Sequence, residues 1–359
     1  MSTPDTTPAT STSAPATAPS AAATTQAATP PSLTMTSQWD KTFPRSQSVE
    51  HAKTSFPTGY GLTLAADLYR PTNTDAPLPA IAVCGPFGAV KEQSSGLYAQ
   101  TMAERGFLTI AFDPSYTGES SGSPRYIASP DINTEDFMSA VDYLTTRPDV
   151  DADRIGIIGI CGWGGIALNA AAADPRIKAT VASTMYDMTR TAGNGYFDAD
   201  DDPTKRLEAR RSLAAQRTAT AATGARPRMG GVVDPLPDNA LQFVKDYHAY
   251  YKTERGFHPR SLNSTDGWAT TGIQAYANAR FLYYIGEIEN AVLVLHGEKA
   301  HSRYMGETAY EKMASGIRPE NKELVIVPGA SHTDLYDGGA KHAVPWERLT
   351  SFFTQAMQR

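Results

Sequence analysis

The chain of 359 residues contains only two cysteines, Cys84 and Cys161. Two cysteines are too few for a disulfide framework, so they do not indicate an oxidising compartment, and we expect a cytoplasmic protein. No apolar run approaches the roughly 20 residues that a membrane-spanning helix needs. An excess of basic charge is also absent, because the net charge is −6 and both signs are interspersed. The composition therefore favours neither a nucleic-acid partner nor a membrane partner.

The N-terminal segment has almost no charge. Residues 1–33 are almost all Ser, Thr, Ala and Pro, with Asp5 as the single charged residue. A secretory signal would have a basic start and an apolar core, and the segment has neither. We predict a disordered tail over residues 1–40. An alternative is that the gene begins later, since Met35 can serve as a start.

Short strand patterns alternate with helical patterns along most of the chain. Strands are predicted at 79–84, 107–112, 155–160, 177–184, 291–295 and 323–327, and helices at 92–105, 134–146, 166–173 and 344–357. Thr134 is the expected N-cap of its helix. Two further strands, 53–56 and 62–69, form an antiparallel edge. The alternation is typical of an α/β protein in which helices flank both faces of a mostly parallel central sheet.

Residues 188–290 do not follow this alternation and are too long for an ordinary connection. We predict a helical cap there, inserted into a core that comprises 41–187 and 291–359. Tyr186, just before the segment, and Trp268 within it are candidates to wall a substrate pocket. Packing inside the cap is the alternative for each single aromatic residue.

The segment around Cys161 has the pattern of a nucleophile elbow. A β-branched strand at 155–160 leads directly into Cys161, which is followed by glycines around Trp163 and then by a helix. Small residues permit the tight turn that holds a nucleophile above the edge of the sheet. Trp163 departs from the pattern, which usually has a small residue two places after the nucleophile. We predict Cys161 as the nucleophile, and an inert buried thiol is the alternative.

A cysteine nucleophile needs a base, and the base needs a group that fixes its tautomer. Of the seven histidines, His332 lies in the loop just after the last predicted strand, so we predict that it is the base. The acid should lie between nucleophile and histidine in the sequence. Glu298 is the first candidate and Asp187 the alternative. Enzymes with this kind of elbow often have the acid as an aspartate at the position of Ala300, so the spacing of the acid is shifted in this chain.

Attack on a carbonyl produces an oxyanion, which backbone N–H groups must hold. Gly162 supplies one donor. Pro86 has no N–H, so Phe87 is the expected second donor, and its ring would form the floor of the acyl pocket. The predicted pocket residues are Phe87, Trp163, Tyr186 and Trp268. The alternative is that residues 85–88 only form a turn.

From about Phe43 to the C-terminus, the sequence resembles a known family. The resemblance lies in GPFGAVKEQ at 85–93, DPSYTGES at 113–120, GICGWGG at 159–165, GEKAHS at 297–302 and HTDLYD at 332–337. The chain resembles α/β-hydrolases of the dienelactone-hydrolase-like group that use a cysteine nucleophile, among them bacterial hydrolases and fungal polyketide thiohydrolases and acyltransferases. This resemblance implies the α/β-hydrolase fold and an acyl-Cys161 intermediate that is discharged to water or to an alcohol.

We therefore expect an esterase or thioesterase that acts on a small-molecule acyl substrate without a cofactor or a metal ion. An acyltransferase that uses the same residues is one alternative. A non-catalytic binding protein on a hydrolase fold is another, favoured by Trp163 and Ala300. The oligomeric state stays open, a homodimer included.

Overall fold

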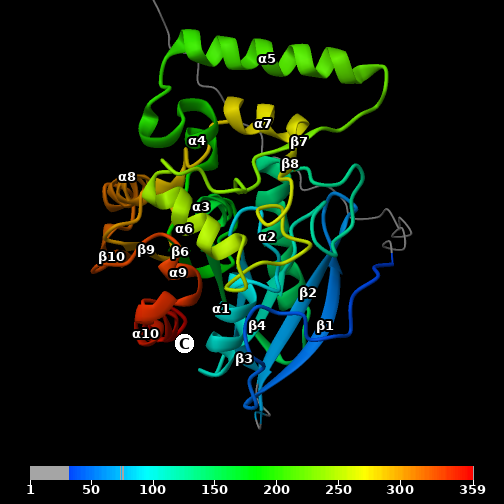
Figure 1. The fold of residues 1–359 in the computed structure, drawn as a ribbon. Coiled ribbons are helices and arrows are strands. Elements are labelled where there is room, and N and C mark those ends of the chain that lie inside the picture. Colours follow the sequence, from blue (N-terminus) through cyan, green and yellow to red (C-terminus); the bar gives the residue numbers. More distant parts are fainter. Residues whose placement is uncertain (1–31, 73, 75–76, 359) are drawn as a thin grey trace, which may run out of the picture.

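The computed structural model describes residues 32–72, 74 and 77–358, which form a central sheet with helices on both of its faces (Figure 1). The sheet has eight strands in the order β1-β2-β4-β3-β5-β6-β9-β10. β1 (Val49–Pro57) and β2 (Thr63–Pro71) pair antiparallel, and β2 also runs antiparallel to β4 (Leu108–Phe112). The other pairs are parallel. This architecture confirms the predicted α/β fold.

The remaining strands of the sheet are β3 (Leu78–Cys84), β5 (Val150–Ile160), β6 (Ile177–Ser183), β9 (Ala291–Gly297) and β10 (Lys322–Val327). The helices of the core are α1 (Ser94–Ala103), α2 (Pro130–Thr145), α3 (Gly162–Ala173), α8 (Arg303–Ala314), α9 (Asp334–Asp337) and α10 (Trp346–Ala356).

One predicted helix start is wrong. α2 begins at Pro130 after Ser129, so Thr134 lies inside the helix, where its hydroxyl donates to the Pro130 carbonyl. The reason is local, since a proline is well suited to the first helical position and Ser is a favoured residue before it.

Side chains of the parallel strands pack into two cores, one on each face of the sheet. In β3, Ile81 and Val83 belong to the core that α1 and α10 cover, whereas Ala82 and Cys84 belong to the core that α2 and α3 cover. A parallel sheet is apolar on both faces for this reason. The loops that follow the parallel strands therefore gather at one edge, where sites of such sheets lie.

The segment between β6 and β9 consists mainly of helices and loops. Its elements are α4 (Met188–Asn194), α5 (Pro203–Ala221), α6 (Gln242–Tyr251), α7 (Ile273–Asn278) and the short strands β7 (Arg228–Met229) and β8 (Trp268–Ala269), which pair with each other. Short 3-10 helices in this segment cover Tyr196–Asp198, Thr270–Gly272 and Ile285–Glu287, and two others after β9 cover Pro319–Asn321 and Gly339–Lys341. α5 lies across one end of the molecule beside α7, and none of its residues is buried (Figure 1).

The predicted disordered tail covered residues 1–40, of which 1–31 lie outside the described residues. Residues of the remaining stretch contact the rest of the described chain. The Thr36 N–H donates to Glu119 at 2.7 Å, and the Asp40 carboxylate pairs with Arg260 at 2.8 Å. These contacts place the start of the packed chain before residue 41. Within the described part of the chain, no helix combines the length and the apolar character needed to cross a membrane.

Candidate active site

Cys161 lies at the turn between β5 and α3 with φ of 60° and ψ of −128°. A non-glycine residue in such a region costs of order 1–3 kcal/mol and is typical of functional positions. The tight approach of the chain requires Gly159, where an added Cβ would lie 2.0 Å from the Trp163 carbonyl oxygen. The Cys161 N–H donates to the Ser183 carbonyl at 2.9 Å, which ties the turn to β6. The thiol is thus held at the carboxyl edge of the sheet.

Four groups beside the Cys161 sulfur lower the pKa of its thiol. They are the hydroxyls of Tyr336 and Tyr247 and the backbone N–H groups of Gly162 and Phe87. Burial raises the pKa of the Cys161 thiol above its ordinary value, and these four groups offset the shift only in part. The two N–H groups are those expected to form the oxyanion hole, so a substrate carbonyl oxygen can bind beside them.

A buried network of ions holds the loop that carries Phe87. Lys91 Nζ lies 2.7 Å from carboxylate oxygens of Glu92, Asp113 and Glu119. Burial alone would lower the pKa of Lys91, but Asp113 and Glu92 raise it above its ordinary value. The three carboxylates are close enough to share one metal ion, but the ammonium group already lies among them. The network therefore joins the motif at 85–93 to the motif at 113–120.

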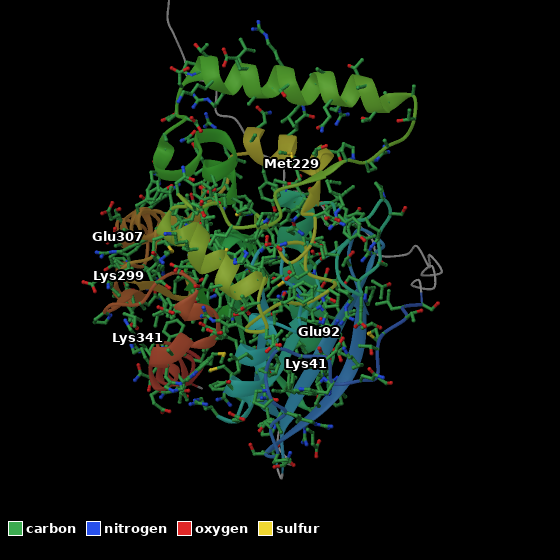
Figure 2. All side chains as sticks on the ribbon, viewed as in Figure 1. Lys41, Glu92, Met229, Lys299, Glu307 and Lys341 are labelled. Carbon is green, nitrogen blue, oxygen red and sulfur yellow. The ribbon has the colours of Figure 1, made fainter. Side chains whose placement is uncertain are left out.

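Figure 2 places Glu92 of this network beside Lys41, near β1 and β2, whereas Lys299, Glu307 and Lys341 lie along another side of the molecule. Arg260, from the segment between β6 and β9, reaches Glu92 at 2.9 Å. The network thus also ties that segment to the core.

His332 follows β10 and is buried with both ring nitrogens hydrogen-bonded. Nδ1 lies 2.8 Å from the Ser302 hydroxyl and 2.9 Å from the Thr184 hydroxyl, and Nε2 lies 3.0 Å from the Tyr336 hydroxyl. Burial lowers the pKa of His332 well below its ordinary value, and the neighbouring His301 lowers it further. Imidazole and thiol are therefore both neutral at rest.

The prediction of a carboxylate partner for His332 is wrong for both candidates. The exposed Glu298 accepts a hydrogen bond from the Gly329 N–H at 2.7 Å. Asp187 caps α4, where it accepts from the N–H groups of Thr189 and Arg190. Among the described residues, only hydroxyls hydrogen-bond the His332 imidazole.

The loop after β9 explains why Glu298 does not reach the imidazole. The Glu298 N–H still bonds to the Val327 carbonyl as if the strand continued, and the chain then turns so that Ser302 faces the imidazole. Sequence reasoning missed Ser302, Thr184 and Tyr336. Ser302 and Tyr336 lie within two of the motifs that carry the family resemblance, which was the available signal.

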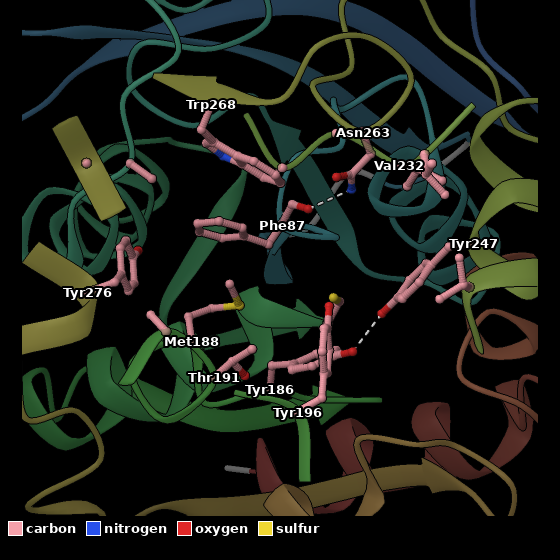
Figure 3. A pocket seen from close by; sticks show the side chains of 18 of the residues that line it. Phe87, Tyr186, Met188, Thr191, Tyr196, Val232, Tyr247, Asn263, Trp268 and Tyr276 are labelled. Carbon is pink, nitrogen blue, oxygen red and sulfur yellow. Dashed lines mark hydrogen bonds between the residues drawn. The ribbon is translucent and has the colours of Figure 1, made fainter. Parts of the chain in front are cut away.

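A cavity of about 410 Å³ opens beside the Cys161 sulfur. Phe87, Tyr186 and Trp268, three of the residues expected in a substrate pocket, line this cavity. The Phe87 ring stacks on Trp268 at a centroid distance of 5.0 Å, and its carbonyl accepts from Asn263 at 2.8 Å (Figure 3). Figure 3 also shows Tyr186 hydrogen-bonded to Tyr247 on the other side of the cavity.

The prediction that Trp163 lines this cavity is wrong. Its ring is 1% exposed and packs edge-on against Phe112 and Phe137, in the core between the sheet and α2. The tight elbow directs the side chain two places after Cys161 into the fold, and the glycines beside it leave room for the ring.

The lining of the cavity is almost entirely apolar or aromatic. Among the described residues around it there is no Asp, Glu, Lys, Arg or His. Most of the wall comes from the segment between β6 and β9, with Met188, Tyr196, Val232, Phe243 and Tyr276 among its residues. The cavity therefore suits an uncharged, apolar group.

The sheet and the elbow define an α/β-hydrolase-fold protein of the hydrolase or acyltransferase type. An α/β hydrolase from Penicillium, GrgF, shares this fold with a TM-score of 0.69 and 21% identity, over 86% of this chain and 99% of the other. More specifically, residues 59–338 match the X-Pro dipeptidyl-peptidase (S15) family, and the chain belongs to this family. The family is serine-type, whereas the elbow of this chain holds Cys161.

Curated relatives include an uncharacterized protein of Pseudomonas aeruginosa, 55% identical over 90% of this chain and 85% of the relative. A crystal structure of a hypothetical protein from that organism has a TM-score of 0.86 and 53% identity, over 90% of this chain and 99% of the other. Two fungal relatives match shorter parts. Thiohydrolase aneE of Aspergillus aculeatus is 33% identical over 37% of this chain and 41% of its own length. Acyltransferase drtE of Aspergillus calidoustus is 30% identical over 55% of this chain and 60% of its own length.

Proposed function

We propose that this protein hydrolyses carboxylic ester or thioester bonds through an acyl-Cys161 intermediate. The observation that carries the proposal is a thiol at an elbow beside the Gly162 and Phe87 N–H groups, with His332 hydrogen-bonded to Tyr336 of the same cavity. Sulfur attacks the substrate carbonyl, the two N–H groups hold the oxyanion, and the alcohol or thiol leaves with a proton. Water then attacks the thioester carbonyl, and the acid product departs.

The site favours activated acyl groups over peptides for two reasons. A dipeptidyl-peptidase substrate carries an N-terminal ammonium group, which needs a carboxylate, and the cavity wall described above has none. In addition, the imidazole is held by hydroxyls and its pKa is low. Such a base is weak, so an ester or thioester with a good leaving group is the better substrate.

Acyl transfer to an alcohol is the second candidate. The relative drtE, an acyltransferase, and the apolar wall of the cavity favour it, because an apolar acceptor can displace water there. The dienelactone-hydrolase-like chemistry and a cytoplasmic location remain predictions from the sequence.

A substrate panel tests the proposal. Purified protein is incubated with 4-nitrophenyl esters of neutral and charged acids, an acyl thioester and an X-Pro anilide. We expect turnover of esters with neutral apolar acyl groups and no cleavage of the anilide. Cys161→Ala should lose at least about a thousandfold in rate. Cys84→Ser is the matched control and should keep its rate, because the Cys84 thiol is buried in the other core and donates to the Phe112 carbonyl.

Mass spectrometry should detect the acyl group on the peptide that contains Cys161, and added alcohol should yield ester if transfer operates. Full activity in Cys161→Ala would refute the acyl-cysteine mechanism. Preferred cleavage of the anilide would assign the protein to the peptidases instead.

A further inference from the structure

The hydroxyl of Tyr336 lies between the thiol and the imidazole. It lies 3.0 Å from His332 Nε2, it lowers the pKa of the Cys161 thiol, and Tyr336 and Cys161 line the same cavity. No hydrogen bond joins Cys161 directly to His332 within the described part of the chain. A proton that passes between sulfur and imidazole therefore meets this hydroxyl first.

We propose that Tyr336 is a catalytic residue that relays the proton from Cys161 to His332; the inference rests on the acyl-cysteine mechanism proposed above. As sulfur bonds to the substrate carbonyl carbon, its proton moves to the Tyr336 oxygen, and the Tyr336 proton moves to His332 Nε2. The electron pair of the carbonyl goes to the oxyanion. When the leaving group departs, a proton returns from His332 by the same route or directly.

Packing holds the Tyr336 ring in this position. Tyr250 contacts it edge-on at a centroid distance of 5.0 Å, and Tyr251 lies at 6.1 Å. The Tyr336 N–H donates to the Thr333 carbonyl at 3.1 Å, and its own carbonyl accepts from Ser94 at 2.8 Å. A ring fixed by its neighbours and at both backbone groups suits a relay, since the distance to each partner is set in advance.

The chemistry of the hydroxyl fits the same role. A phenol can accept one proton and donate another, so it moves a proton without acquiring net charge. Burial raises the pKa of Tyr336 well above its ordinary value, which keeps it protonated throughout the working pH range. His332 keeps Nε2 available for it, because hydroxyls of Ser302 and Thr184 occupy Nδ1.

A competing route starts from the same sulfur. Tyr247 also lines the cavity beside Cys161 and lowers the pKa of its thiol. Its hydroxyl lies 2.9 Å from that of Tyr186, and Tyr186 in turn bonds to His301. This chain needs one more transfer before it reaches an imidazole. The shorter route through Tyr336 is therefore the one we assign.

The test compares three Tyr→Phe variants on an activated neutral ester. Tyr336→Phe should lower kcat/KM by roughly a hundredfold or more, the usual loss when an acid–base group is removed. Tyr247→Phe should lose less than about tenfold. Tyr69→Phe is the matched control and should not change activity, because the Tyr69 ring is fully buried in β2 and its hydroxyl has no hydrogen-bond partner among residues 32–72, 74 and 77–358. Thermal melts of all three variants show whether each one folds.

A second readout separates a relay from a structural role. Without the relay the thiol must lose its proton to solvent, so the rate of Tyr336→Phe should rise about tenfold per pH unit from pH 7 to 9. The wild-type rate should stay nearly constant over that range. A folded Tyr336→Phe with wild-type kcat/KM, or a larger loss in Tyr247→Phe, would overturn the relay. Cys161→Ala distinguishes failure of the relay from failure of the acyl-cysteine mechanism. If Cys161→Ala is inactive, either of these outcomes for the tyrosine variants refutes the relay alone. If Cys161→Ala is active, the acyl-cysteine mechanism itself fails.

Discussion

Two hydroxyls should orient His332 where a carboxylate was expected, and substitution of each can measure their contribution. Ser302→Ala removes the 2.8 Å partner of Nδ1 but leaves the Thr184 hydroxyl at 2.9 Å. One neutral hydrogen bond contributes about 0.5–1.5 kcal/mol. Since about 1.4 kcal/mol corresponds to a factor of ten in rate, we expect Ser302→Ala to lower kcat/KM by about two- to tenfold.

The double variant Ser302→Ala/Thr184→Val leaves Nδ1 buried without a partner. An unsatisfied buried polar group costs about 1–3 kcal/mol, so the loss should grow to about 5- to 150-fold. The imidazole also loses the partners that select its tautomer. The fold loss in kcat/KM of the double variant is compared with the product of the fold losses of the two single variants. The excess measures how far each hydroxyl substitutes for the other.

The assay is kcat/KM on one activated ester, with folding checked by urea unfolding. Glu298→Gln and Asp187→Asn serve as carboxylate controls, and each should change the rate less than about twofold, because neither carboxylate hydrogen-bonds the imidazole. A larger loss in Glu298→Gln than in Ser302→Ala would refute the reasoning and restore the carboxylate as the orienting group.

Two further predictions concern pH. Because burial raises the pKa of the Cys161 thiol, iodoacetamide should alkylate it more slowly than a free thiol at pH 7, and the rate should rise about tenfold per pH unit up to pH 9; fast alkylation independent of pH would indicate a thiolate instead. Burial also lowers the pKa of His296 to about 3, and within the part of the chain that the structure describes neither of its ring nitrogens has a hydrogen-bond partner. The unfolded chain binds this proton near pH 6.5, so the free energy of unfolding falls by about 1.4 kcal/mol per unit as pH drops from 6.5 towards 3. The change in the free energy of unfolding caused by His296→Leu, measured by urea unfolding, should therefore be about 2 kcal/mol more favourable at pH 5 than at pH 8. An equal change at both pH values would contradict this account.

Much of the fold could be predicted from local pattern. Apolar strands such as 155–160 are buried on both faces of the sheet. Because helical patterns separate these strands along the chain, a parallel arrangement is the expected one. The predicted start of α2 at Thr134 is too late, because Ser129 and Pro130 form a stronger start signal four residues earlier. The end of the tail was also misplaced, since the contacts of Asp40 are with Arg260, far away in sequence.

Within the site, the sequence was informative where a group follows a strand directly. Cys161 follows β5 directly and Phe87 lies three residues after the end of β3, so both stand at the carboxyl edge of the sheet beside the cavity. Side-chain direction inside a loop is different, because one turn of the chain decides whether Glu298 or Ser302 faces the imidazole. Tyr336 could not be assigned from pattern, since its position depends on packing between α6 and α9.

The elements that perform chemistry and the elements that shape the cavity come from different stretches of the chain. Cys161, Phe87 and His332 belong to loops of the sheet, whereas most of the cavity wall lies in 188–290. Insertions, deletions or exchanges in that stretch can therefore alter acyl preference while the strand ends keep their spacing. Diversification among relatives should concentrate there, and a library for a new acyl group needs to vary only this stretch.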